Sequence, residues 1–536
     1  MSSATPRMTD RERSVALSVF LVLTMLVTAL IVFKLGTAKG DTAIFYQLTE
    51  NIAEGAGPTS QIFQDTTSYV FSSDLLNQPA AVVAKDPLRP LATATDDPLR
   101  GHAYYILFLL APLTRIVPVA VLFAALFALS FVGMVAVAYF ALRRCGIGIP
   151  ASALFCVLVI THPAWSQSLF DGQFYPDRLF VGAGALFAYL LYARRDSRVG
   201  IIVAAVLCAL INERGALIAG IFAVGYAILY WKELRDRVFT LCVGVGLLVY
   251  SVFLVKVVLS NIIYGTYFIS VADVLGHFHD VQFVERALLL VLVCSPFVVL
   301  ALFAPRMALI AAVCILPNIL GNIGGAEKIG WSTHYPSYYL PILVMAALAG
   351  FVNLWRKAKT ANVPAIPYVA LGVMILGLSM LDPASYAGVR ISPDQLSNQF
   401  LLRFPRELAT YYGPAGRELD GEAADVSRVI PPGARVSSIE SGMPFLYRGR
   451  TIHYFPTGID QAQYAVVSAS GMDGGRTYGG VLSFLGRQEA AKANDLIFAR
   501  MRRDGYDFDR ARYYPMLGLA IIKHGRPAKE SEQHAQ

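Results

Sequence analysis

The chain has 536 residues, of which 56% are hydrophobic and only 15% are charged. Soluble globular domains carry about 25% charged residues, so this composition excludes an ordinary soluble protein and indicates an integral membrane protein. The net charge of +8 does not indicate a nucleic-acid partner, because most basic residues outside the C-terminal region lie in short loops between apolar segments. There they report membrane orientation.

Eleven apolar segments predict membrane spans, and the first, SVALSVFLVLTMLVTALIVFK, is long enough to serve as an uncleaved anchor. We expect the spans at 14–34, 117–142, 149–165, 178–193, 199–212, 216–231, 238–260, 287–304, 307–322, 337–354 and 364–381. With the N-terminus in the cytoplasm, the positive-inside rule is satisfied by the short-loop residues Arg11, Arg13, Arg143, Arg144, Arg194–Arg198, Lys232–Arg237, Arg306 and Arg356–Lys359.

This topology divides the chain into a transmembrane domain at 1–381, with a long first outer loop at 35–101, and an extracytoplasmic domain at 382–525. The polar tail 526–536 should be disordered. Apolar runs at 434–439, 451–455 and 464–468 predict strands of a small α/β domain. Its glycines form neither GxGxxG nor a P-loop, which argues against nucleotide binding there.

Asp41 follows the first span and therefore lies at the edge of the membrane. An ionisable group held there is a functional hypothesis by default. As a functional group, Asp41 is a general base that takes the proton of an acceptor hydroxyl. The alternative is a solvated charge at a helix end.

Asp171 and Asp177 lie in SQSLFDGQFYPDRLF, a short outer loop with aromatic neighbours. Aromatic rings beside carboxylates suit sugar binding, through stacking and hydrogen bonds to hydroxyls. Phe and Tyr are also the usual residues of an interfacial belt, so both interpretations stay open.

The sequence Asn212-Glu213-Arg214-Gly215 interrupts an apolar helical hairpin with a charge pair. As a functional site, Arg214 would bind phosphate or Glu213 would be a second acid, since a guanidinium binds phosphate through two parallel hydrogen bonds. The alternative is a paired turn at the surface.

Two histidine groups complete the candidates. His277, His279 and Asp280 could ligate a divalent metal, although a solvated loop is the simpler interpretation. His334 and Tyr335 stand at the start of the tenth span, where they would contact an anionic lipid headgroup or form hydrogen bonds at the interface.

Several of these segments resemble a large, mostly uncharacterised family of predicted bacterial membrane proteins placed in the GT-C glycosyltransferase superfamily. The similar segments are GDTAIFYQLTENIAEG, GHAYYILFLLAP, LFDGQFYPDRLFV, the NERG hairpin, HYPSYYLPILV and, near the C-terminus, VSRVIPPGARVSSIESGMPFLYRGRTIHYFP. The resemblance implies a GT-C-like helical membrane protein of about eleven spans with a small extracytoplasmic α/β domain.

Residue by residue, the resemblance identifies Asp41 as the acid of the first outer loop and Glu213 as the acid of the hairpin. It also identifies His102 as the histidine before the next hydrophobic segment, and His334-Tyr335 as the HY pair. At Tyr175-Pro176-Asp177 the chain departs from the His-Pro-Glu-like triplet that the resemblance leads us to expect.

The resemblance implies inverting transfer of a sugar from a polyprenyl-phosphate donor to a glycan or lipid acceptor of the cell envelope, at the outer face of the plasma membrane. The candidate residues are consistent with this reaction, since the expected topology places a cationic or histidine contact for phosphate and a carboxylate near the acceptor on the same side of the membrane. The alternative function is that of a transporter or flippase of lipid-linked glycans. It is less favoured because the acids cluster at the outer edge and not at the midplane.

Overall fold

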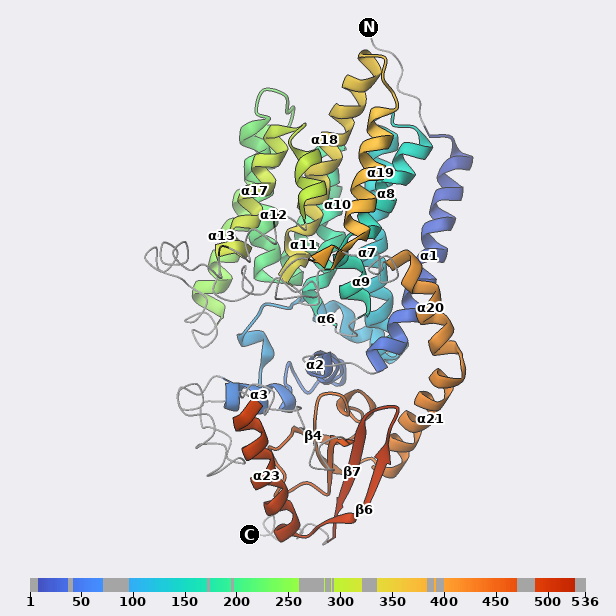
Figure 1. Ribbon diagram of the computed structural model, residues 1–536. Coiled ribbons are helices and arrows are strands. Elements are labelled where there is room, and N and C mark those ends of the chain that lie inside the picture. Colours follow the sequence, from blue (N-terminus) through green and yellow to red (C-terminus); the bar gives the residue numbers. More distant parts are fainter. Residues whose placement is uncertain are drawn as a thin grey trace.

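The computed structural model describes residues 8–36, 42–70, 96–170, 174–193, 197–259, 284, 291, 294–320, 335–382, 390–391, 400–469 and 487–525. These residues form a bundle of long helices, a layer of short helices at one end of the bundle, and a small α/β unit beyond that layer (Figure 1). The expected combination of a mostly helical membrane protein with a C-terminal sheet is confirmed.

The bundle consists of apolar helices. Its described helices are α1 (Asp10–Gly36), α7 (Val119–Arg144), α8 (Ile149–Thr161), α9 (Pro163–Phe170), α10 (Phe180–Ala193), α11 (Arg198–Ile211), α12 (Glu213–Leu229), α13 (Arg237–Phe253), η4 (Leu254–Val258), α17 (Pro305–Leu320), α18 (Leu340–Thr360) and α19 (Ile366–Ser379). Residues 294–301 are also helical.

Among the described residues, four helices are long and apolar enough to cross a membrane: Asp10–Val32, Val119–Arg144, Arg237–Val258 and Pro336–Thr360. The pair α8 and α9, bent by 56°, makes a fifth if it forms one broken span. Shorter apolar helices include Arg198–Ile211 and Ile366–Ser379. Several membrane helices are therefore present, and the number eleven stays a prediction.

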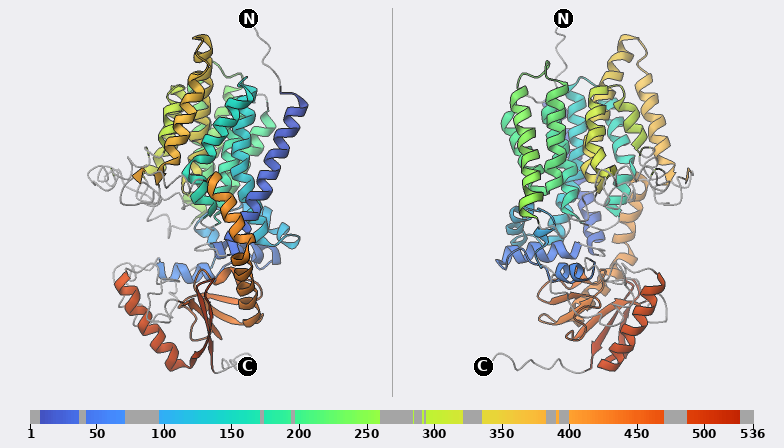
Figure 2. Two further views of the ribbon diagram at one scale, coloured as in Figure 1. Left: turned by 45° about the vertical axis from the view of Figure 1, so that its right-hand side comes forward. Right: turned by 90° about the vertical axis from the view of Figure 1, so that its left-hand side faces the viewer.

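The basic loop residues gather at the end of the bundle where α1 begins. Arg143, at the end of α7, donates from its guanidinium to the Glu12 carboxylate of α1, with an Nη2–Oε2 distance of 3.0 Å. At the turns of neighbouring helices, Arg198 pairs with Asp236 at 2.6 Å. The C-terminal unit lies at the opposite end of the bundle in all views (Figure 2).

The layer of short helices separates the bundle from the C-terminal unit. It comprises α2 (Thr42–Glu54), α3 (Gln61–Val70), η1 (Pro98–Arg100), α6 (Ile106–Leu110) and η2 (Ala111–Arg115). Helix α2 buries residues on both sides: Phe45 and Tyr46 pack into the bundle core, while Ala43 and Ile44 pack into the core of the C-terminal unit. Helix α2 is thus a structural link between the two.

The C-terminal unit is a five-stranded sheet with helices beside it. The chain passes from β1 (Leu381–Asp382) and β2 (Arg390–Ile391) through α20 (Phe400–Tyr412) and α21 (Pro414–Val429). The sheet then forms in the order β4-β3-β5-β7-β6, where β3 (Arg435–Ser438) is parallel to β4 (Thr451–Tyr454) and β5 (Tyr464–Ser468). The antiparallel strands are β6 (Tyr506–Tyr514) and β7 (Leu519–His524), which follow α23 (Arg487–Asp504).

Strands β3, β4 and β5 fall where the apolar runs predicted them. Strands β6 and β7 were not predicted. In β6, YDFDRARYY, charged residues dilute the alternation, and only Tyr506 and Tyr514 at its two ends are buried. Its pairing with the buried strand β7 holds it in the sheet.

Candidate functional site

Three segments predicted to carry function meet at the end of the bundle that faces the layer of short helices. They are the turn before α6, the short helix η3 (Pro176–Leu179) before α10, and the junction of α11 and α12. A fourth, η6 (Tyr335–Tyr338), leads into α18 and contacts η3. Helices α10, α12 and α18 all begin here, so their loops bring residues distant in sequence to one place (Figure 1).

Asp177 is the centre of a buried hydrogen-bond network. Its side chain is 1% exposed. Tyr104 donates its hydroxyl to Oδ2 at 2.9 Å, and Asn212 donates its amide Nδ2 to Oδ1 at 3.2 Å. Tyr338 also donates its hydroxyl to Oδ1. A buried carboxylate is stable only when its oxygens are hydrogen-bonded, and here three separate segments supply the donors.

Glu213, the first residue of α12, forms a second network next to Asp177. One carboxylate oxygen is 3.0 Å from Nδ1 of His102, and the other accepts the backbone N–H of Ala103 at 3.0 Å. The Glu213 side chain is 1% exposed and that of His102 is 18% exposed. Glu213 therefore orients His102, and His102 is the more accessible member of the pair.

The junction before α12 has a local cause. Asn212 caps the helix, because its side-chain oxygen accepts the backbone N–H of Arg214 at 2.8 Å. The same amide group donates to Asp177 through its nitrogen. The Asn212 side chain thus caps the start of α12 and joins it to Asp177. Arg214 follows on the first turn of α12, half-buried, where the helix dipole and its own guanidinium both favour an anion.

The tyrosine beside these acids remains a hydrogen-bond donor. Burial raises the pKa of the Tyr104 hydroxyl well above its ordinary value, and the charges of Asp177 and Glu213 raise it further. The hydroxyl therefore keeps its proton at neutral pH and continues to donate to Asp177.

Two further contacts fix the surroundings of Asp177. Arg178 is completely buried, donates from Nη1 to the carbonyl of Ser168 at 2.9 Å, and lies 5.1 Å from the ring centre of Phe127. The backbone N–H of Phe174 donates to Oγ1 of Thr42 at 2.9 Å. The first residue of α2 is thereby joined to the segment that leads into Asp177.

The structure thus brings together His102, Asp177, Glu213 and Arg214 from the predicted set. Tyr335 begins η6, next to them. Asp41, Asp171 and His334 lie outside the described residues, as do His277, His279 and Asp280. In the part of the chain that the structure describes, no three His, Cys, Asp or Glu side chains are close enough to hold a metal ion.

Sequence reasoning missed Tyr104 and Tyr338. Both stand in tyrosine pairs, at Tyr104-Tyr105 and Tyr338-Tyr339, each directly before an apolar helix. Such pairs also fit an interfacial aromatic belt, so their sequence alone does not distinguish a buried donor from a membrane anchor.

Comparison with protein families shows which family the chain matches. The model of a family described as predicted membrane protein (DUF2079) matches residues 32–467, from the end of α1 through most of β5. The match includes every described residue of the two acidic networks. Comparison with curated proteins gives no match.

Proposed function

The chain belongs to the DUF2079 family of predicted membrane proteins, and we propose that it is a glycosyltransferase of the GT-C type. It transfers a sugar from a polyprenyl-phosphate donor to a glycan or lipid acceptor at the outer face of the plasma membrane. The observation that carries this proposal is the pair of buried carboxylates, Asp177 and Glu213, beside His102 and Arg214 at one end of a membrane bundle.

The arrangement suits a lipid-linked donor. The prenyl chain of such a donor lies among membrane helices, and its phosphate lies at the membrane surface. Arg214 lies in the first turn of α12 and His102 in the turn before α6, where they would bind that phosphate. Glu213 holds the His102 ring through Nδ1 and so directs its other nitrogen.

The proposed reaction is a single displacement. The oxygen of an acceptor hydroxyl forms a bond to the anomeric carbon, and the bond from that carbon to the phosphate oxygen breaks. The prenyl phosphate leaves with the electron pair, and Asp41 takes the hydroxyl proton as general base. Inversion at the anomeric carbon follows from one displacement. Support for Asp41 comes from the residue after it, Thr42, which is bonded to the segment before Asp177.

This proposal includes a topology with eleven spans, a cytoplasmic N-terminus and an extracytoplasmic C-terminal unit. The gathering of basic residues at the end of the bundle opposite that unit supports it. Reporter fusions at residues 195 and 420 should report opposite sides of the membrane. If both report the same side, the orientation is wrong.

A reconstituted assay tests the function. Purified protein in liposomes with radiolabelled polyprenyl-phosphate sugar and a cell-envelope fraction should release label from the lipid and attach it to the acceptor. If the donor is not consumed but moves between leaflets, the protein is a transporter of lipid-linked sugars instead.

A further inference from the structure

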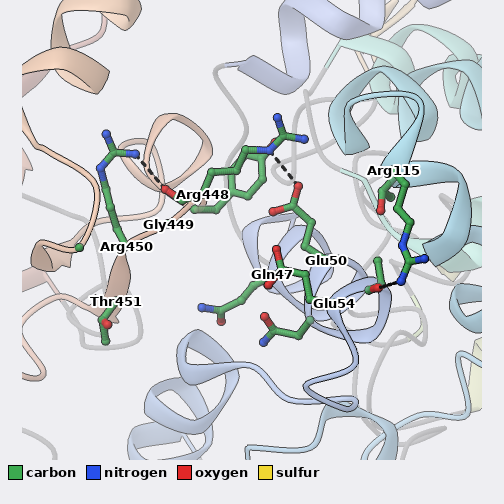
Figure 3. A pocket seen from close by; sticks show the side chains of 13 residues that line it. Gln47, Glu50, Glu54, Arg115, Arg448, Gly449, Arg450 and Thr451 are labelled. Carbon is green, nitrogen blue, oxygen red and sulfur yellow. Dashed lines mark hydrogen bonds and ion pairs between the residues drawn. The ribbon is translucent and has the colours of Figure 1, made fainter.

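A cleft that is separate from the acidic networks lies between the layer of short helices and the C-terminal unit. It is an open cleft of about 750 Å³. Helix α2, the end of η2 and the turn before β4 supply its walls (Figure 3). Its lining is Gln47, Glu50, Asn51, Ala53, Glu54, Thr114, Arg115, Gly433, Tyr447, Arg448, Gly449, Arg450 and Thr451.

The cleft is built on hydrogen bonds that hold its two walls together. Arg448 of the C-terminal unit donates to Glu50 of α2 at 3.0 Å across the cleft. On the other side, Arg115 donates to the carbonyl of Ala53 at 2.6 Å. Arg450 donates to the carbonyls of Ser427 and Arg448, and so shapes the turn itself.

The lining has many hydrogen-bonding groups and little excess charge. Three arginines face two glutamates, which leaves a net charge of +1. Glu54, Arg115 and Thr451 are exposed, so their donors and acceptors are accessible to a ligand. Burial raises the pKa of Tyr447 to about 12, so its hydroxyl stays a donor beside them. Interleaved acids and guanidinium groups disfavour a polyanion and suit a neutral molecule with many hydroxyls.

We propose that this cleft binds a neutral oligosaccharide, and that this oligosaccharide is the acceptor. The second part rests on the proposed function. Helix α2 provides the geometric argument, because it begins one residue after Asp41 and carries Glu50 and Glu54 farther along. At 1.5 Å per residue, Glu50 is about 12 Å from Thr42 along the helix axis. We therefore expect an acceptor of more than one sugar, which extends from the cleft toward the start of α2.

The test is direct binding of the full-length protein, in lipid nanodiscs, to an array of neutral and anionic bacterial oligosaccharides. The wild type should retain neutral oligosaccharides of two or more sugars. Arg448→Gln and Glu54→Gln should each weaken this binding about tenfold or more, the effect of losing a hydrogen bond to a charged group. Arg448→Gln also removes the hydrogen-bond partner of Glu50 and so disturbs the contact between the two walls. Glu54 is exposed, so Glu54→Gln changes the cleft and leaves the fold intact.

Arg417→Gln and Glu418→Gln, exposed residues of α21 outside the cleft, are the matched controls and should bind as the wild type does. Unchanged binding by the Glu54→Gln variant, or retention of anionic oligosaccharides alone, would overturn the assignment. Neutral oligosaccharide binding by a protein that transfers no sugar would support the cleft and count against the glycosyltransferase proposal. The experiment therefore distinguishes a failure of the oligosaccharide-binding proposal from a failure of the glycosyltransferase proposal.

Discussion

His102 and Glu213, which are 111 residues apart in the chain, are joined by a 3.0 Å contact between the imidazole Nδ1 and a carboxylate oxygen. The carboxylate is buried and the imidazole is partly accessible. On this basis we propose that Glu213 positions His102, and that His102, the more accessible of the two, contacts the substrate. The two should consequently act as one unit.

A double-mutant cycle tests this unit. His102→Ala and Glu213→Gln should each reduce sugar transfer. The double variant should be as active as the less active of the two single variants, because the second change removes an interaction that the first has already abolished. The measurement is kcat/KM for the donor in the reconstituted assay. Strictly additive losses would show that the two residues act separately.

Asp177 should be more important for stability than for chemistry. Asp177→Ala would leave the hydroxyls of Tyr104 and Tyr338 and the amide of Asn212 without their acceptor. Each buried donor left unpaired costs about 1–3 kcal/mol, so the melting temperature in detergent should fall clearly. Asp495→Ala, at an exposed position of α23, is the control and should melt like the wild type. An unaltered melting temperature in the Asp177 variant would contradict this role.

Helix α3 should bind the C-terminal unit as a separate peptide. Asp65 is buried in this contact, where it accepts the backbone N–H of Tyr454 at 2.8 Å and lies 3.3 Å from Nδ1 of His453. Ile62 belongs to the core of the same unit. Residues 395–525 expressed alone should unfold cooperatively, and a peptide of residues 58–70 should raise their melting temperature.

The Asp65→Ala form of this peptide is the matched control and should have no such effect, since it lacks the carboxylate that accepts the Tyr454 N–H. Equal stabilisation by both peptides would show that the contact is not specific.

The ion pair of Glu50 and Arg448 predicts that the stability of the folded protein depends on pH. Burial raises the pKa of Glu50, and Arg448 opposes this shift only in part, while the hydrogen bond that Arg448 donates to Glu50 raises the pKa of Arg448. The two directions are compatible, because Glu50 is 14% exposed and Arg448 56%, so the acid bears most of the desolvation. Because the pKa of Glu50 is higher in the folded than in the unfolded protein, Glu50 contributes to stability at pH values below its pKa in the unfolded chain. This stabilisation is lost as the pH rises through the pKa of Glu50 in the folded protein.

Glu50→Gln removes this titration. Its melting temperature relative to the wild type should therefore increase as pH rises from acid to neutral, measured by thermal unfolding in one detergent. A constant difference, or one that falls with rising pH, would contradict the assignment.

The sequence was informative where a signal is local. Apolar runs and basic turns indicated the helices of the bundle, and acidic residues inserted between apolar stretches drew attention to Asp177 and Glu213, while the family resemblance drew attention to His102. Their partners were not predictable, because the contact of Tyr338 with Asp177 spans 161 residues and that of Tyr454 with Asp65 spans 389. Such contacts depend on how the helices pack, which no short sequence pattern encodes.

Helix packing also decides which role each acid has in the site, so these roles could not be predicted from the sequence. Sequence alone gave Asp177 and Glu213 similar standing as substrate-binding acids. Packing supplies Asp177 with three side-chain donors and Glu213 with a histidine, which separates a buried structural carboxylate from one that orients an accessible group.

The central claim, sugar transfer with Asp41 as the base, is tested most directly by comparing Asp41→Asn with Asp74→Asn, an acid of the same predicted outer loop. Both variants should insert and fold, since each keeps the size of the side chain. At matched membrane levels, Asp41→Asn should lower transfer from polyprenyl-phosphate sugar by ~10²–10⁴-fold, and Asp74→Asn should leave it near the wild-type rate. Equal, near-normal transfer by the two variants would contradict the account.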